Sequence, residues 1–242
     1  MATINHNIEK IRGESWKMFD EISLRYDFLN RMLSWGQDLH WRRRMGTYLP
    51  TKNNLRVLDV ATGTADVPLE LMKANPRIIS ADGIDLAPKM LAQAQQKVAQ
   101  KGLQNKIDLK PGDGHHLPYS AQSFDVVTIA FGIRNMEDPQ KVLSEMFRVL
   151  KNEGRVLVLE FSLPQNPALR ILHLFYLRAL VPAIGFLFSG HYRAYRYLNQ
   201  TIETFPFGDR FLELLEKTGF KELECHSLMF GAATIYQGDK GS

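Results

Sequence analysis

The feature that most constrains the fold is an apolar strand that ends in a turn of small residues. Leu55 to Val60 is predicted to be a strand because four of its six residues are leucine or valine. Small residues follow where a helix is predicted to begin, at Ala61, Gly63 and Ala65. About twenty residues further on, a second apolar run ends at Asp85, the interval at which α/β proteins place an acid on the ribose of a nucleotide-like cofactor. The sequence therefore predicts an α/β sheet with a cofactor at its carboxyl edge.

The residues of this turn do not suit a dinucleotide. A dinucleotide site uses G-x-G-x-x-G so that backbone N–H groups can approach the pyrophosphate, whereas this turn has only Gly63. Asp59, just before the turn, would repel a diphosphate but suits a cation. We therefore predict S-adenosyl-L-methionine, a sulfonium without phosphate, as the cofactor. Its methionine part would lie at Asp59, Ala61 and Gly63, and its ribose at Asp85 with the neighbouring Leu86.

Strands and helices alternate along the chain. We predict seven strands, at 55–60, 78–85, 106–110, 124–131, 154–161, 222–228 and 232–237. Alternation with helices indicates a largely parallel sheet that is covered on both faces. The link between the last two strands is too short for a crossover helix, so we expect an antiparallel hairpin, an ending typical of methyltransferase sheets. The predicted fold is thus a Rossmann-like, class I S-adenosylmethionine-dependent methyltransferase sheet.

Length and composition agree with one domain. A chain of 242 residues with 45% hydrophobic residues can bury a full core. We expect 1–242 to be a single domain, with a helical cap over 1–50 and a helical insertion over 167–217 on the substrate side. The net charge of +4 is mild and forms no basic stripe, so we expect no nucleic-acid partner. The single cysteine, Cys225, and a start without an apolar signal stretch predict a cytoplasmic protein.

Two loops at the predicted sheet edge carry further candidate site residues. Asp113 and Gly114 follow the third strand, where Asp113 can accept a hydrogen bond from the exocyclic amine of adenine. The fourth strand leads into Arg134 and Asn135 at the same edge. A buried arginine commonly pairs with an acid, so the chemistry alone leaves both a structural and a catalytic role open for Arg134. No spacing of cysteines and histidines matches a zinc site, and we expect no metal.

Several stretches resemble one known family. The segment from Tyr26 to Trp41 is similar to the N-terminal signature of the quinone C-methyltransferases of menaquinone and ubiquinone synthesis. The segment from Arg148 to Ser162 is similar to their second signature. With Phe131 to Asn135 and Tyr195 to Leu198, the resemblance extends from Trp16 to Gln237.

The resemblance implies roles for individual residues. The family's cofactor-binding positions are matched by Thr64, Asp85, Asp113, Gly114 and, where a serine is usual, Ala130. Its catalytic positions, which help to deprotonate the quinol through a bound water, are matched by Arg134, Asn135 and Tyr26. The chain departs from the family's pattern at the pair Asn152-Glu153, where Pro-Gly is usual, and also at Thr62, Ala65, Leu29 and Ala194. Thr62 and Ala65 narrow the turn after the first strand, but residues of this size still allow the cofactor to approach the backbone closely.

The function that the resemblance implies is C-methylation of a polyprenylated quinol ring, with demethylmenaquinol converted to menaquinol. Three alternatives stay open. They are methylation of 2-polyprenyl-6-methoxy-1,4-benzoquinol in ubiquinone synthesis, methylation of another small molecule, and a noncatalytic scaffold of the quinone pathway.

A polyprenyl substrate needs an apolar entrance. The most apolar stretch is 168–188, but Arg170, His173 and Arg178 interrupt it, so we do not expect a helix that spans a bilayer. The stretch suits a helix pair packed on the sheet, and it also suits a lid that holds the prenyl tail and rests on the inner face of the cytoplasmic membrane. The sequence leaves both open, as it does a homodimer or a complex of quinone-synthesis enzymes.

Overall fold

The computed structural model describes residues 2–183 and 192–241, with the backbone alone for 2–12, 24–25 and 192–196. Parts of two stretches singled out above lie outside this description, namely 184–188 and the side chains of Ala194, Tyr195 and Arg196.

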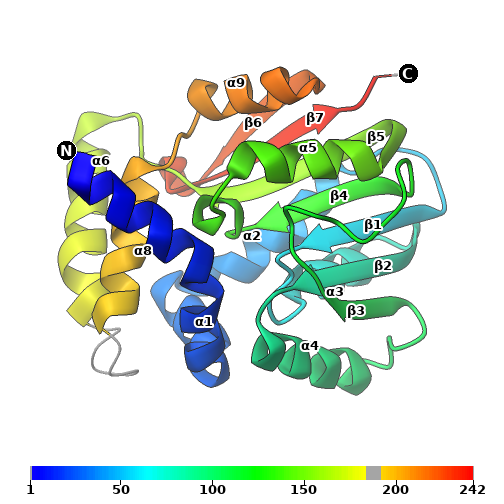
Figure 1. Cartoon of the computed structure of the whole chain (residues 1–242), viewed down its shortest axis with the longest axis horizontal. Coiled ribbons are helices and arrows are strands. Elements are labelled where there is room, and N and C mark those ends of the chain that lie inside the picture. The colour runs from blue at the N-terminus through cyan, green and yellow to red at the C-terminus, as the bar shows by residue number, and fades with distance from the viewer. Residues whose placement is uncertain (1, 184–191, 242) are drawn as a thin grey trace.

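Seven strands form one sheet in the order β3-β2-β1-β4-β5-β7-β6 (Figure 1). The strands are β1 (Leu55–Val60), β2 (Ile78–Asp85), β3 (Ile107–Pro111), β4 (Phe124–Ala130), β5 (Leu150–Phe161), β6 (Lys221–Leu228) and β7 (Ala233–Asp239). Neighbouring strands from β1 to β5 are parallel, and β7 runs antiparallel between β5 and β6. The predicted fold class and its closing hairpin are confirmed. β5 begins earlier than predicted because the pairing with β4 starts at Leu150.

Helices cover both faces of the sheet. They are α1 (Ala2–Leu33), α2 (Gln37–Met45), α3 (Asp66–Ala74), α4 (Pro88–Gln100), α5 (Pro139–Val149), α6 (Pro167–Phe175), α8 (Tyr192–Thr204) and α9 (Asp209–Thr218). One face packs against α2, α3 and α4, and the other against α5 and α9. Side chains alternate between these faces along each strand, so that on β1 Val57 belongs to the first core and Leu58 to the second.

Two helices next to the carboxyl edge start at well-defined caps. The Asp138 side chain accepts a hydrogen bond from Lys141 N at 3.0 Å, and Pro139 follows it at the start of α5. Asn166 caps α6 in the same way, by accepting from the N–H groups of Ala168 and Leu169. These caps fix the ends of the loops that leave β4 and β5.

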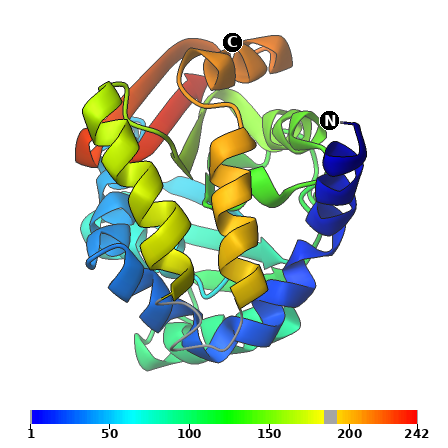
Figure 2. The same ribbon diagram turned by 90° about the vertical axis from the view of Figure 1, so that its left-hand side faces the viewer.

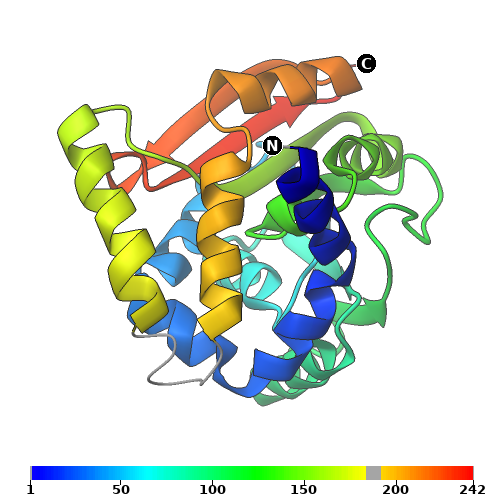
Figure 3. The same ribbon diagram turned by 60° about the vertical axis from the view of Figure 1, so that its left-hand side comes forward.

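A layer formed by α1, α6 and α8 lies across the carboxyl edge of the sheet (Figures 2 and 3). Its own small core joins Leu29 of α1, Leu177 of the π-helical turn after α6, and Ile202 of α8. α9, which falls within the predicted insertion 167–217, packs beside α5 on the sheet instead. Within residues 2–183 and 192–241, no helix combines the length and the apolar character that a membrane crossing requires.

Candidate active site

Two cavities at the carboxyl edge of the sheet adjoin each other. The larger has a volume of ≈ 450 Å³ and lies among α1, α2, α6 and α8, and the smaller has ≈ 170 Å³ and lies at the turn after β1. Both are lined by Phe19, Tyr26, Phe131 and Asn135. The strand order changes direction between β1 and β4, the position at which open α/β sheets bind their ligands. A molecule in one cavity can therefore touch a molecule in the other.

Most of the predicted cofactor residues line the smaller cavity. These are Ala61, Gly63, Asp85, Leu86, Asp113, Gly114 and Ala130. Gly63 has a left-handed φ of 55°, and a Cβ added there would meet no heavy atom within 4 Å, so the backbone itself forms this part of the wall. Asp85 accepts hydrogen bonds of 2.8 Å from Gly63 N and Ala87 N. Burial raises the pKa of Asp85, although these two N–H groups oppose the rise.

The residues of the smaller cavity fit S-adenosyl-L-methionine. The bare backbone at Gly63 allows the close approach that an amino-acid moiety needs. Asp85 presents a half-buried carboxylate in the wall of this cavity, which suits the two ribose hydroxyls. Apolar side chains that suit an adenine ring come from Leu86, Met90 and Met136.

Asp113 is held in place by a histidine that sequence reasoning did not assign to the site. His115 donates to Asp113 Oδ1 from its backbone N at 2.9 Å, and its ring Nδ1 lies 2.7 Å from the same oxygen. The ring's other nitrogen, Nε2, accepts from Asp138 N at 3.2 Å, which places the proton on Nδ1. Burial alone would raise the pKa of Asp113, but the hydrogen bonds from His115 hold it below its usual range.

Two predicted cofactor residues turn away from both cavities. The Asp59 side chain is 1% exposed and accepts a 2.6 Å hydrogen bond from the Thr128 hydroxyl. Burial raises the pKa of Asp59 to about 7, although Thr128 opposes the rise. The Thr64 hydroxyl donates to Asp27 at 2.7 Å and accepts from Lys97 at 3.1 Å. Neither side chain lines the cavities, because tertiary partners orient both elsewhere, so the geometry gives the predicted side-chain contacts with the cofactor no support.

The predicted catalytic residues lie at or near the junction of the two cavities. Phe131, directly after β4, has a left-handed φ of 57°, a strained conformation for a bulky residue. Its carbonyl oxygen accepts from Arg134 Nη1 at 2.7 Å and from Asn135 Nδ2 at 3.3 Å. The strained turn thus holds Arg134 and Asn135 in the wall of the larger cavity, where Tyr26 of α1 joins them.

Arg134 also forms a buried ion pair with Glu160 of β5. The distance from Nη1 to Glu160 Oε1 is 2.7 Å, and the two side chains are 3% and 2% exposed. Burial raises the pKa of Glu160, and the positive charge of Arg134 opposes the rise. Glu160 was not identified as a site residue from the sequence. An acid in the apolar run of β5 was the signal that could have identified it.

Three polar groups at or beside the junction can still form a hydrogen bond with a ligand. Arg134 Nε and Asn135 Oδ1 are buried and have no hydrogen-bond partner among the described residues. Burial raises the pKa of Tyr26, although Arg42, a hydrogen bond with Asn30 and Arg134 oppose the rise, so the phenol stays protonated and can donate a hydrogen bond. The junction can therefore supply hydrogen bonds to a ring oxygen.

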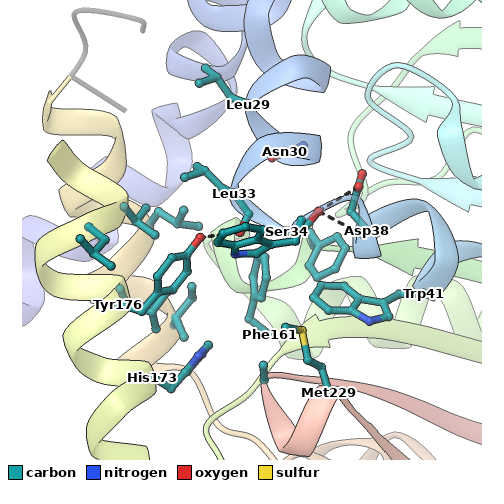
Figure 4. A pocket seen from close by; sticks show the side chains of 18 of the residues that line it. Leu29, Asn30, Leu33, Ser34, Asp38, Trp41, Phe161, His173, Tyr176 and Met229 are labelled. Atoms are coloured by element: carbon teal, nitrogen blue, oxygen red, sulfur yellow. Dashed lines mark hydrogen bonds between the residues drawn. The ribbon is translucent and has the colours of Figure 1, made fainter. Parts of the chain in front are cut away.

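The rest of the larger cavity is mainly aromatic and aliphatic. Figure 4 shows Trp41, Phe161, Tyr176 and Met229 around the space. The rings of Phe131 and Phe161 lie 4.4 Å apart, and those of Trp41 and Phe131 lie 6.1 Å apart. Such a wall suits a flat aromatic ring and an attached hydrocarbon chain. In the part of the chain that the structure describes, no group of three or more His, Cys, Asp and Glu side chains is placed to hold a metal ion.

Comparisons with known proteins identify the family. Residues 8–240 match the ubiE/COQ5 methyltransferase family. The chain is 44% identical to the ubiquinone/menaquinone biosynthesis C-methyltransferase UbiE of Geotalea daltonii, over 99% of this chain and 100% of that one. It is 42% identical to the demethylmenaquinone methyltransferase of Thermus thermophilus, over 92% of this chain and 100% of that one.

Solved structures show the same fold. The [4+2]-cyclase SpnF matches with a TM-score of 0.67 at 16% identity, over 93% of this chain and 94% of that one. A SAM-dependent methyltransferase from Thermotoga maritima matches with a TM-score of 0.66 at 16% identity, over 93% of this chain and 99% of that one. Because one of these is named as a cyclase, the fold alone does not decide the reaction.

Proposed function

The chain belongs to the ubiE/COQ5 methyltransferase family, and from this premise we propose that it methylates a ring carbon of a polyprenylated quinol, with demethylmenaquinol as the acceptor. The observation that carries the proposal is the junction of the two cavities at Tyr26, Phe131 and Asn135. Methyl transfer needs a donor site and an acceptor site in direct contact, so that the reacting carbons lie about 3–3.5 Å apart. The two adjoining cavities supply that arrangement.

The cofactor of the proposed reaction is S-adenosyl-L-methionine, which supplies an electrophilic methyl group on a positively charged sulfur. Asp85 would bind its ribose and Asp113 the adenine amine, while the backbone at Gly63 would face the methionine part. The junction residues would then border the transferred methyl group. The apolar walls on both sides would keep water from the reacting carbon.

The acceptor must lose a phenolic proton so that the ring carbon beside the oxygen becomes nucleophilic. After this carbon has taken the methyl group from the sulfur, it would lose its own proton and the ring oxygen would regain one, which restores the aromatic quinol. Asn135 Oδ1 would accept a hydrogen bond from the quinol hydroxyl, or from a water that carries its proton to solvent. Tyr26 and Arg134 Nε would donate to the developing phenolate. A donor of this kind contributes about 10²- to 10³-fold in rate. Because Glu160 already balances the charge of Arg134, we assign Arg134 mainly the placement of a donor rather than a full positive charge.

The direct test uses methyl-labelled S-adenosyl-L-methionine and measures label in the extracted lipid. The acceptors are reduced demethylmenaquinol and 2-polyprenyl-6-methoxy-1,4-benzoquinol, because the relative from Geotalea daltonii is named for both quinone pathways. The oxidised quinones are the matched controls, since they have no phenolic proton to lose and should take no label. Label in demethylmenaquinol supports the proposal. Label in the benzoquinol alone would replace it by the ubiquinone reaction, and no label in either would contradict it.

We also propose that the mouth of the larger cavity rests on a lipid bilayer, where the polyprenylated acceptor is dissolved. Most of the exposed large hydrophobic side chains of the described residues line this cavity, and they are Trp35, Leu169, Leu172, Phe175, Leu180, Met229 and Phe230. Trp35 and Phe230 are 78% and 82% exposed and have left-handed φ values of 55° and 59°. Exposing large hydrophobic side chains and holding their backbone in the left-handed region both cost free energy, so this arrangement indicates a function.

The charge of this region suits anionic lipid. Residues 161–203 contain four arginines and one acid, Glu203, which pairs with Arg178, so the region keeps an excess of positive charge. The variants Trp35→Ser and Phe230→Ser should reduce co-sedimentation with anionic vesicles. Ile79→Ser is the matched control, because Ile79 is 47% exposed on β2 and lines neither cavity. Equal sedimentation of all variants would contradict this part of the proposal.

The expected location, the cytoplasm at the inner face of the membrane, belongs to the same proposal. A homodimer or a complex of quinone-synthesis enzymes is compatible with this location, because the surface proposed to contact the bilayer lies only around Trp35 and Phe230.

A further inference from the structure

The larger cavity contains a polar atom that the proposed methyl transfer does not use. Nε2 of His173 is buried and, like Arg134 Nε and Asn135 Oδ1, has no hydrogen-bond partner among the described residues. All three residues line the larger cavity. Arg134 and Asn135 follow β4 in the sheet, whereas His173 projects from α6 in the layer that covers it. The cavity therefore offers hydrogen-bonding atoms from two separate walls.

Several other polar side chains in this cavity already have partners. The Tyr176 hydroxyl donates to Leu33 O at 2.6 Å. Asp38 accepts a hydrogen bond from the Ser34 hydroxyl at 3.0 Å and pairs with Arg42 at 2.9 Å. Buried polar atoms normally have a hydrogen-bond partner, so the unpaired nitrogen of His173 indicates a position where a ligand can supply one.

The position of His173 on its helix directs the side chain into the cavity. Leu169, Leu172, His173 and Tyr176 all line the cavity, and this spacing is one face of a helix. Figure 4 shows the His173 ring directed into the space beside Tyr176. Asn166 fixes the start of the helix by capping it. A histidine in the middle of an apolar stripe breaks the pattern at the place where the stripe faces the ligand space.

The charge state of His173 suits a neutral hydrogen-bonding role. Burial lowers the pKa of His173, so the imidazole is uncharged at neutral pH. A neutral imidazole has one nitrogen that accepts and one that donates. A buried acceptor without a partner lowers stability, and a ligand that supplies a hydroxyl removes this penalty.

We propose that His173 binds the second hydroxyl of the substrate ring, on the far side from the hydroxyl held near Arg134 and Asn135. This inference rests on the proposed function, because a quinol carries two hydroxyls at opposite positions of one ring. Nε2 accepts a hydrogen bond from the second hydroxyl, and the junction residues hold the first. With both hydroxyls held, the ring can no longer slide or tilt away from the junction, so His173 helps to keep the reacting ring carbon beside the methyl group.

The test compares wild type, His173→Leu and His173→Gln in binding and in turnover. Quinol affinity is measured by quenching of tryptophan fluorescence, because Trp41 lines the cavity, and S-adenosylhomocysteine affinity is measured by calorimetry. His173→Leu should weaken quinol binding about five- to a hundredfold and leave S-adenosylhomocysteine binding unchanged. His173→Gln, whose amide reaches the same place, should restore part of the affinity.

A second comparison changes the ligand instead of the protein. A prenylated ring with only the first hydroxyl should bind wild type more weakly than the quinol does, and His173→Leu should no longer distinguish the two. His226→Leu is the matched control, because His226 stacks on Tyr48 and lines neither cavity. It should bind both ligands as wild type does.

The outcomes separate this inference from the proposed function. If wild type binds the quinol and His173→Leu binds it equally well, His173 does not hold the ring and the inference is wrong. If the leucine variant binds more weakly but distinguishes the two ligands as wild type does, His173 acts through packing and the inference is also wrong. If wild type binds no quinol, the proposed function fails, and this inference fails with it.

Discussion

Removal of Arg134 should reveal two effects that the structure allows to be separated. Arg134→Met leaves the Glu160 carboxylate at 2% exposure without the partner that now lies 2.7 Å away. Breaking a buried pair in this way costs about 3–5 kcal/mol. For a chain of 242 residues this corresponds to a Tm lower by about 6–20 °C. The loss should be smaller at pH 5 than at pH 8, because burial already raises the pKa of Glu160 and a protonated Glu160 needs no partner.

The double variant Arg134→Met/Glu160→Gln tests this reasoning. Glutamine keeps an oxygen that accepts from Phe161 N, which now donates to Glu160 at 2.8 Å, but it carries no charge. We expect the double variant to recover most of the lost Tm in scanning calorimetry, and to stay about 10²- to 10³-fold slow in methyl transfer. An Arg134→Met variant that melts as wild type does would refute the energetic argument. A double variant with wild-type turnover would refute the placement of Arg134 at the reacting ring.

Three further predictions concern the cofactor and stability. Asp85→Ala should weaken S-adenosylhomocysteine binding by about 1–3 kcal/mol in calorimetry. Asp108→Ala is the control, because the Asp108 side chain is exposed, and it should bind as wild type does. An Asp85→Ala variant with wild-type affinity would exclude the ribose assignment. Because the folded-state pKa of Asp59 is raised from 3.8 to about 7, its contribution to stability is full below pH 4 and is lost as the pH rises through about 7. Asp59→Asn should therefore flatten the fall in Tm between pH 5 and pH 8, and an unchanged slope would show that Asp59 is not its source. Glu153→Gly should raise the Tm by about 1–4 °C, because Glu153 has a left-handed φ of 60° that glycine adopts without strain. The neighbouring Asn152→Gly is the control and should lower the Tm. A lower Tm in both variants would contradict the strain argument.

The positions in the candidate site that could be located from the sequence are those that local pattern determines. Gly63 and Asp85 are joined by a hydrogen bond of 2.8 Å, as expected for a strand, a tight turn and an acid at that interval. Gly63 and Asp85 lie at the ends of two adjacent parallel strands, and the hydrophobic pattern of the sequence is enough to locate these ends. The departure at Glu153 also has a local meaning, because the family's usual glycine suits the left-handed backbone found there.

The parts that sequence did not predict depend on contacts between distant segments. The Thr64 hydroxyl forms hydrogen bonds with Asp27 of α1 and Lys97 of α4 and does not line the cofactor cavity. These residues are distant in the sequence, so no local pattern could predict their contact. Glu160 meets Arg134 only because β4 and β5 are adjacent in the sheet. His173 reads in the sequence only as an interruption of an apolar stretch, and its unpaired nitrogen becomes evident once α6 is placed over the cavity.

The most direct test of the account is a crystal structure with S-adenosylhomocysteine and a short-tailed demethylmenaquinol bound together. We predict the adenosyl group in the smaller cavity and the quinol ring in the larger one. The sulfur should face a ring carbon across the junction at Tyr26, Phe131 and Asn135, with room for one methyl group between them. A quinol bound elsewhere, or a ring separated from the sulfur by protein, would contradict the account.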